Sequence, residues 1–133
     1  MKWSWIILFS FCFFSSCQNK ESYKKAEDAE DAGREFIRAS LDGNYDKAKF
    51  YLYKDSADFN IRLLDKWKIN YEALNKDEKS GYRSASIMPI EISPVEDSAF
   101  YTYTYYNSYK KDTTTIRILN VNDEWLVDLR DLH

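Results

Sequence analysis

The apolar residues of this chain change their spacing near Gly81. Between Ala26 and Leu74 they recur at steps of three and four residues, which is typical of amphipathic helices. After Gly81 the step becomes two, and β-branched and aromatic residues dominate, which is typical of strands with one buried face. Helices followed by a run of short-linked strands give the order of an α+β fold. We therefore predict N-terminal helices packed on a four-stranded antiparallel sheet.

The first two helices are predicted to be joined tightly. The apolar face of the first helix runs from Ala26 to Leu41, and Gly43 can take the left-handed conformation that ends a helix. Asn44 can cap the second helix, which is short and ends near Lys54. Four acidic residues lie in the first turns of the first helix: Glu27, Asp28, Glu30 and Asp31. We interpret them as charges that complement the positive end of the helix dipole, in preference to ligands of a metal ion.

A third and a fourth helix are predicted before Gly81. The third begins at Asp55 or Ser56 and turns an apolar stripe inward at helical spacing. The stripe consists of Phe59, Leu63, Leu64, Trp67, Tyr71 and Leu74. Asn75, followed three residues later by Glu78, is typical of a capped helix start. We expect one or two further turns there, ending before Gly81.

Four strands are predicted after Gly81, near residues 83–93, 98–107, 112–121 and 124–130. Their connections are short, so an antiparallel meander is expected. Asn122-Asp123 is suited to a two-residue hairpin turn. Pro89 predicts an edge strand, a bulge or a broken start, because proline cannot donate to the ladder.

The first sixteen residues have the pattern of a signal peptide. Lys2 and the amino terminus supply positive charge, Trp3 to Phe14 carry no charge, and the small residues Ser15 and Ser16 follow. The apolar run is shorter than the roughly 18 residues that a membrane-spanning helix requires. We therefore predict that residues 1–16 are a signal peptide that is removed.

The sequence from Phe14 to Cys17 resembles the lipobox of bacterial lipoproteins, with Phe14 where that family usually has an aliphatic residue. The resemblance implies cleavage before Cys17, diacylglycerol on its thiol and an acyl chain such as palmitate on its amino group. Residues 17–25 would then be a lipid-anchored tether, and residues 26–133 a single α+β domain. Acyl chains hold a protein on a membrane without crossing it. The alternative is an ordinary secretory signal with an incidental cysteine.

The residue at position 18 and the net charge of the chain indicate where the protein is located and which partners it could bind. Gln18 lacks the Asp that resembles an inner-membrane retention signal, so we expect the outer membrane of a cell envelope, on its periplasmic face or the cell surface. The formal charge of −3 becomes −4 when Lys2 is removed, so nucleic acid is a poor partner. Cys12 would leave with the signal and Cys17 would carry lipid, which leaves the domain without a disulfide or a thiol. No cofactor is predicted.

One stretch has the opening of a calcium-binding loop. Asp42, Asn44 and Asp46 have the spacing of the first ligands of an EF-hand. The sixth position of that loop requires Gly and is Lys47, and the twelfth requires Glu and is Tyr53. No metal site is therefore predicted.

Two segments resemble small bacterial lipoproteins of unknown function in the nuclear transport factor two-like superfamily. They are DGNYDKAKFYL, which starts at Asp42 after an amphipathic helix, and NDEWLVD, which starts at Asn122 and ends the sheet. The resemblance covers roughly residues 24–130. It implies a cone, in which a curved antiparallel sheet wraps around helices and leaves a cavity at the open end. The superfamily contains isomerases, dehydratases, transport adaptors and non-catalytic members, so the fold does not decide the function.

An enzyme of the isomerase or dehydratase kind is the alternative function. The only histidine is the last residue, His133, so catalysis would depend on carboxylates and tyrosines. Glu91, Asp112 and Asp128 are the candidate bases, and Asp128 is the weak candidate of most interest, because ketosteroid-isomerase-like members of the superfamily use an acidic base with a tyrosine. The alternation of the last strand instead places Asp128 beside Arg130, which we interpret as a surface ion pair.

A non-catalytic binding or accessory role is the preferred prediction. Tyr101, Tyr103 and Tyr105 project to one side of a strand and form a row of rings. With Trp125 they are the candidate ligand-binding residues, able to stack on a small molecule, a glycan or a lipid head group. The competing interpretation is that the row packs on the helices. A third possibility is an accessory subunit that binds an envelope protein through its sheet.

Overall fold

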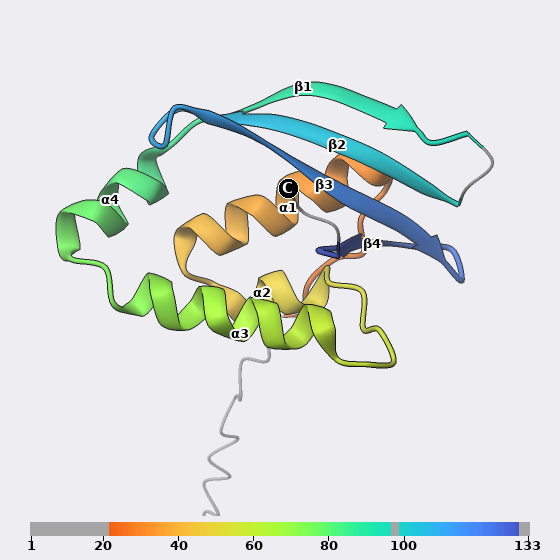
Figure 1. Ribbon diagram of the computed structural model, residues 1–133, viewed down its shortest axis with the longest axis horizontal. Coiled ribbons are helices and arrows are strands. Elements are labelled where there is room, and N and C mark those ends of the chain that lie inside the picture. The colour runs from red at the N-terminus through yellow and green to blue at the C-terminus, as the bar shows by residue number, and fades with distance from the viewer. Residues whose placement is uncertain (1–21, 97–98, 131–133) are drawn as a thin grey trace, which may run out of the picture.

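The computed structural model describes residues 22–96 and 99–130. Its helices precede its strands, which confirms the predicted α+β order (Figure 1). The elements are α1 (Ala29–Asp42), α2 (Tyr45–Phe50), α3 (Phe59–Glu72), α4 (Lys76–Ser84), β1 (Ile87–Pro94), β2 (Phe100–Asn107), β3 (Asp112–Val121) and β4 (Glu124–Asp128). Within the described ranges, no helix combines the length and the apolar character that crossing a membrane requires.

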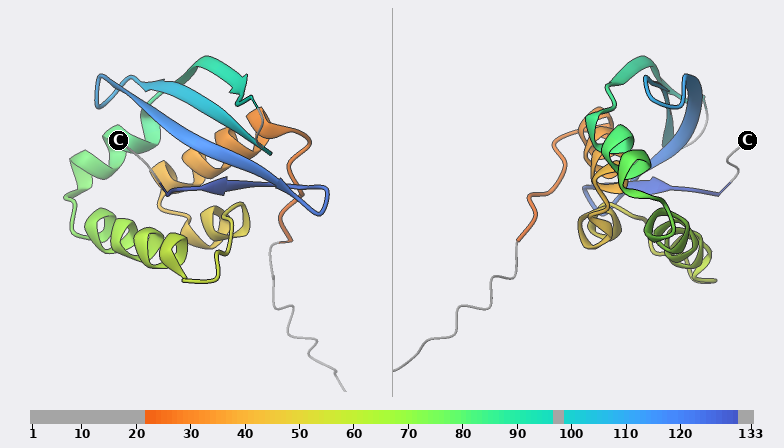
Figure 2. Two further views of the ribbon diagram at one scale, coloured as in Figure 1. Left: turned by 45° about the vertical axis from the view of Figure 1, so that its right-hand side comes forward. Right: turned by 90° about the vertical axis from the view of Figure 1, so that its left-hand side faces the viewer.

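The strands form one open antiparallel sheet in the order β1-β2-β3-β4. The sheet arches over α1, and α3 lies on the far side of α1 from β1 (Figures 1 and 2). The edge at β4 is covered, because the Tyr53 N–H donates to Val127 O and the Val127 N–H donates to Tyr51 O. The edge at β1 has no neighbouring strand among the described residues.

Two sequence predictions about the sheet are confirmed. Pro89 lies on the edge strand β1, and the pairing of β1 with β2 shifts its register between Pro89 and Glu91, as at a bulge. Asn122 and Asp123 connect β3 to β4 with φ angles of 52° and 62°. Positive φ at both positions is the requirement of the tight hairpin turn that suits the twist of the strands.

Helix α1 is the centre of the core. The Asp28 carboxylate accepts from Asp31 N at 2.8 Å at one end, and Gly43, with a φ of 76°, ends the helix at the other. The inner face of α1 packs against the sheet so closely that a Cβ atom on Gly33 would lie 3.0 Å from Ile118 Cδ1. The largest buried apolar side chains come from α1, the segment after α2, the sheet and the residue that follows β4: Phe36, Leu52, Tyr103, Ile116, Ile118, Val127 and Leu129.

Several helix boundaries differ from the predicted ones. Helix α1 begins after its cap at Asp28, later than Ala26. Helix α2 ends at Phe50, well before Lys54, because the next residues pair with β4. Helix α3 begins at Phe59, where the prediction had Asp55 or Ser56, and its Phe59 side chain is exposed, so the expectation that Phe59 faces inward was wrong.

The end of the helical region also differs. Helix α4 continues through Gly81 to Ser84, so the expectation that the helix ends before Gly81 was wrong. A Cβ atom at position 81 would lie 2.3 Å from Tyr109 Cε2, which indicates that glycine there serves the close approach of the Tyr109 ring. The strand β1 consequently begins at Ile87.

Candidate functional site: a cavity lined by aromatic rings

A cavity of about 390 Å³ lies between the helices and one end of the sheet. Its walls come from the C-terminal halves of α1 and α3, from the beginning of α2, from α4, and from β2 and β3 near the loop that joins them. Six of the lining side chains are aromatic: Phe36, Tyr45, Trp67, Tyr71, Tyr82 and Tyr105. This combination of concave shape and apolar rings is typical of a site for a small molecule.

The cavity exists because the part of α3 that lines it packs on other helices and not on the sheet. The ring of Trp67 in α3 contacts Phe36 in α1, with 6.1 Å between ring centroids. Tyr45 in α2 contacts Tyr71 in α3 at 5.9 Å, and the Tyr45 hydroxyl donates to Trp67 O. These contacts hold α3 apart from β2 and β3, and α1 lies to one side of both (Figures 1 and 2). The space between α1, α3 and the strands is left open, and aromatic rings line it.

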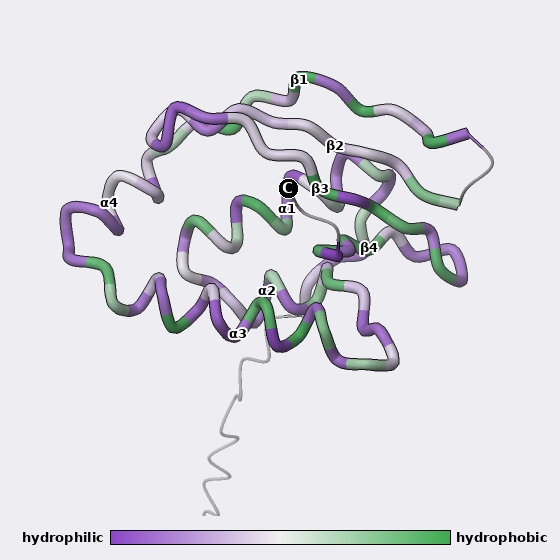
Figure 3. The backbone as a smooth tube through the Cα atoms, viewed as in Figure 1, coloured by the Kyte–Doolittle hydropathy of each residue, from purple (hydrophilic) through white to green (hydrophobic). Residues whose placement is uncertain are grey.

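The rim of the cavity is polar. Lys110 and Asp112 lie in and just after the β2–β3 loop, and both side chains are exposed. The tip of this loop and the beginning of α4 are coloured hydrophilic in Figure 3. The ring of Tyr82 in α4 contacts that of Tyr109 in the loop at 4.9 Å, which connects the two sides of the rim. A ligand would therefore pass a polar entrance to reach apolar walls.

Two hydroxyl groups of the walls, those of Tyr45 and Tyr105, stay protonated at neutral pH. Burial and, to a smaller extent, the neighbouring Tyr71 raise the pKa of Tyr45 to about 12. Burial also raises the pKa of Tyr105, although a hydrogen bond with Thr114 opposes this. Both rings thus offer neutral hydroxyl groups, and neither would act as a base near pH 7.

The predicted tyrosine row lies on the helical side of the sheet, as the packing interpretation expects. Tyr103 is completely buried against Gly33 in the core, and Tyr101 packs on Trp125 with 5.3 Å between ring centroids. Of the four candidate ligand-binding residues, Tyr105 alone lines the cavity. The structure therefore does not bring Tyr101, Tyr103 and Trp125 into this site. The two-residue alternation of the strand predicted correctly which side chains face inward, but it could not predict where along the strand the cavity lies.

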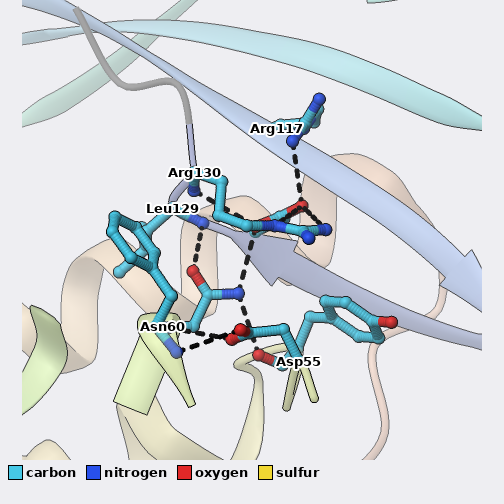
Figure 4. Close-up of polar contacts among 8 residues, drawn as sticks. Asp55, Asn60, Arg117, Leu129 and Arg130 are labelled. Atoms are coloured by element: carbon cyan, nitrogen blue, oxygen red, sulfur yellow. Dashed lines mark hydrogen bonds and ion pairs between the residues drawn. The ribbon is translucent and has the colours of Figure 1, made fainter. Parts of the chain in front are cut away.

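Asp128 is buried at the other end of the molecule, in a polar cluster with Asn60, Arg117 and Arg130 (Figure 4). Its carboxylate accepts from Asn60 Nδ2 at 3.0 Å, Arg117 Nη2 at 3.1 Å and Arg130 Nη2 at 2.7 Å. Arg130 is thus the partner that the sequence indicated. The interpretation as a surface pair was wrong, because Asn60 and β3 cover the Asp128 side chain.

None of the three candidate bases is a carboxyl group inside the cavity. Burial opposes ionisation of Asp128, but hydrogen bonds from Arg130 and Asn60 outweigh it and hold its pKa below the usual value. Asp128 does not line the cavity. Glu91 is exposed and accepts from Ser93 Oγ at 2.7 Å, and Asp112 is exposed at the rim. His133 and Cys17 lie outside the described residues.

The residues of the incomplete calcium motif have other partners. Asp42 forms an ion pair with Arg38, and Asn44 caps α2 by accepting from Lys47 N. Among residues 22–96 and 99–130, no three or more His, Cys, Asp or Glu side chains are grouped so that they could hold a metal ion.

No protein family, no curated protein and no solved structure matches the chain. The resemblance to the nuclear transport factor two-like superfamily therefore stays a prediction, and the site is interpreted from its own chemistry.

Proposed function

We propose that this chain is a lipid-anchored protein of a bacterial cell envelope that binds a small apolar molecule in its aromatic cavity. The observation that carries the binding role is the cavity itself, with six rings in its walls and charged groups only at its rim among the described lining residues. Pockets for small molecules have volumes of about 300–1,000 Å³. At about 390 Å³, this one suits a single small ligand better than a polymer.

The anchor is supported by the sequence of the first 17 residues and by the way the following segment joins the domain. The ring of Tyr23 packs on Phe50 at 5.6 Å, and the Tyr51 hydroxyl donates to Lys24 O at 2.7 Å. Only residues 18–22 would then separate Cys17 from a fixed point of the domain. Five residues span at most about 18 Å, so lipid on Cys17 would hold the domain close to the membrane.

The isomerase or dehydratase alternative requires a base within reach of the ligand. The one carboxyl group among the described lining residues belongs to Asp112, which is exposed to water. A base poised near neutral pH requires burial or a like charge to raise its pKa. We therefore propose a binding protein in preference to an enzyme.

Blocking the cavity tests this proposal. Ser40 lines the cavity, and its hydroxyl donates only to Phe36 O one turn earlier in α1, so replacing it removes no contact between elements. In Ser40→Phe the added ring would occupy the cavity. The probe is Prodan, a neutral naphthyl ketone whose emission shifts to the blue in apolar surroundings. We expect its dissociation constant to rise at least about tenfold, a loss of about 1.4 kcal/mol.

The control is Ser80→Phe, which adds the same ring to an exposed position of α4. The full chain is kept in detergent, and the saturable part of the titration is separated from linear partitioning of Prodan into the micelles. Equal Prodan affinity in both variants and the unchanged protein would refute the proposed binding role, as would the absence of any saturable binding.

A further inference from the structure

Asn107 is a buried polar residue at the end of the cavity. It is the last residue of β2, it is 3% exposed, and it follows Tyr103 and Tyr105 on the inner face of the strand. Its Oδ1 atom accepts from Tyr109 N at 2.9 Å and from Lys110 N at 3.1 Å. Because only the oxygen of the amide can accept, these two bonds fix which way the group is turned.

The Nδ2 group of Asn107 therefore points away from the loop. No hydrogen bond from it to a described residue is found, and it is not among the fully buried side-chain atoms that lack a partner, so it keeps contact with the open space of the cavity. Asn107 lines the cavity. A ligand that supplies an acceptor at this point would take the place of water on Nδ2 and be held in one orientation.

Three other polar groups of the walls are engaged within the protein or fully buried. The hydroxyls of Tyr45 and Ser40 donate to backbone carbonyl groups. The Tyr71 hydroxyl has no partner among the described residues, but it is fully buried, and a Cβ atom on Gly43 would lie 3.0 Å from it. Nδ2 of Asn107 differs from these groups because it belongs to a largely buried residue and keeps its capacity to donate to a ligand.

We propose that the cavity takes a neutral, planar molecule that carries a carbonyl oxygen, such as an aromatic ketone, amide or quinone, and that Asn107 Nδ2 donates to this oxygen. The inference rests on the proposed binding function and names its ligand class. Aromatic walls favour a planar body. Charge is disfavoured because the charged residues among the described lining, Lys110 and Asp112, are exposed at the rim, and an unpaired buried charge is costly.

Two probes of nearly the same shape test the role of the carbonyl. They are 2-acetylnaphthalene and 2-isopropenylnaphthalene, which differ by an oxygen in place of a methylene group. Both are titrated against the full chain in detergent by displacement of Prodan, after correction for partitioning of each probe into the micelles. We expect the ketone to bind roughly three- to tenfold more tightly than the alkene, as one neutral hydrogen bond predicts.

The decisive variant is Asn107→Asp. Its carboxylate keeps an oxygen for Tyr109 N and Lys110 N but presents a second oxygen where Nδ2 was, so it should repel a carbonyl group. We expect the preference for the ketone to disappear or reverse. The control is Asn120→Asp, the same change at an exposed position of β3, which should keep the preference.

A measurement on the unchanged protein covers the case in which Asn107→Asp does not fold. The side-chain amide resonances of Asn107 are followed by nuclear magnetic resonance, and we expect them to shift on addition of the ketone and much less with the alkene. Equal affinities, or equal resonance shifts, would overturn the assignment of Asn107 while leaving the cavity as a binding site. If neither probe binds, both this inference and the proposed function fail.

Discussion

Asp128 connects the end of the chain to the beginning of α3. Asn60 is shared by the two segments, because its Nδ2 donates to Asp128 Oδ1 and to Tyr53 O while its Oδ1 accepts from Leu129 N. Arg130 closes over the carboxylate with three side-chain hydrogen bonds and lies 5.5 Å from the Tyr53 ring. One carboxylate therefore orients two segments that are distant in sequence, residues 53–60 and residues 128–130.

Asp128→Asn should destabilise the folded protein by about 2–3 kcal/mol, because it leaves Arg117 and Arg130 without their shared negative partner. This value lies below the cost of breaking a fully buried pair, since both arginine side chains keep some contact with water. Urea unfolding at pH 7, monitored by circular dichroism, gives the free energy of unfolding. A change below about 0.5 kcal/mol would contradict this role.

The Asp128 carboxylate also makes the free energy of unfolding depend on pH. Its folded-state pKa is depressed below the unfolded value of about 3.9. The stabilisation is therefore complete above the unfolded pKa and is lost as the pH falls through the folded pKa. We expect the free energy of unfolding to fall between about pH 5 and pH 2, and less steeply in Asp128→Asn. Part of the slope should remain in the variant, because hydrogen bonds from Asn60 N and Phe59 N lower the pKa of Asp55 as well.

Sequence reasoning reached the Asp128–Arg130 pair because two residues on one strand face share a side of the sheet. It missed Asn60 and Arg117, which approach from α3 and β3. Asn107 was also missed, although its place after Tyr103 and Tyr105 in the same alternation indicates an inward-facing polar side chain at a strand end. A polar residue on the apolar face of a strand was the signal that could have found it.

At the scale of elements, α4 and the β2–β3 loop support one another. The ring of Tyr109 lies against the backbone of Gly81 and packs on Tyr82. Glycine costs about 1 kcal/mol relative to alanine inside a helix, so its presence in α4 is explained by this contact. The contact is long-range, which is why local sequence signals placed the end of the helix too early.

Gly81→Ala and Tyr109→Ala should show energetic coupling in a double-mutant cycle. Gly81→Ala in Tyr109→Ala should raise the free energy of unfolding by about 0.5–1 kcal/mol, the ordinary helix preference. In the unchanged protein, Gly81→Ala should give a smaller gain in the free energy of unfolding, or a loss, because the new methyl group displaces the Tyr109 ring. Chemical denaturation of the four proteins gives the coupling. An equal gain in both backgrounds would mean that the ring does not depend on Gly81.

Element types could be predicted from the sequence because periodicity is local. The bounds of β3 match the expected ones, and the turn at Asn122 and Asp123 has the expected φ angles. Boundaries failed where a tertiary contact decided them, as where residues after α2 pair with β4. Helix α3 begins late for a similar reason, because the Asp55 carboxylate accepts from Phe59 N and Asn60 N from a position before the helix.

For the whole molecule, the α+β order followed from the change of period, whereas the place of the cavity did not. Its walls combine four helices and two strands, and its volume depends on the distance at which α2 and Trp67 hold α3 from the sheet. Such a distance is set by packing between elements and leaves no local pattern in a sequence. Of the three tyrosines in the predicted row, Tyr105 is therefore the one that lines the cavity.

The proposed anchor predicts where the protein is found in a bacterium. Cys17→Ser removes the thiol that would carry diacylglycerol, so most of the protein should move from the membrane fraction to the soluble fraction. Cys12→Ser is the matched control, because position 12 would be removed with the signal peptide. Detection of the protein in membrane and soluble fractions gives the result. Unchanged membrane association of Cys17→Ser would contradict the anchor.

The most direct test of the account is a crystal structure of the full chain with 2-acetylnaphthalene. We predict the naphthalene rings between Phe36, Trp67 and Tyr105, and the ketone oxygen about 3 Å from Asn107 Nδ2. A ligand bound to the outer face of the sheet, or a cavity filled by its own side chains, would contradict the claim that this protein is built around a binding site.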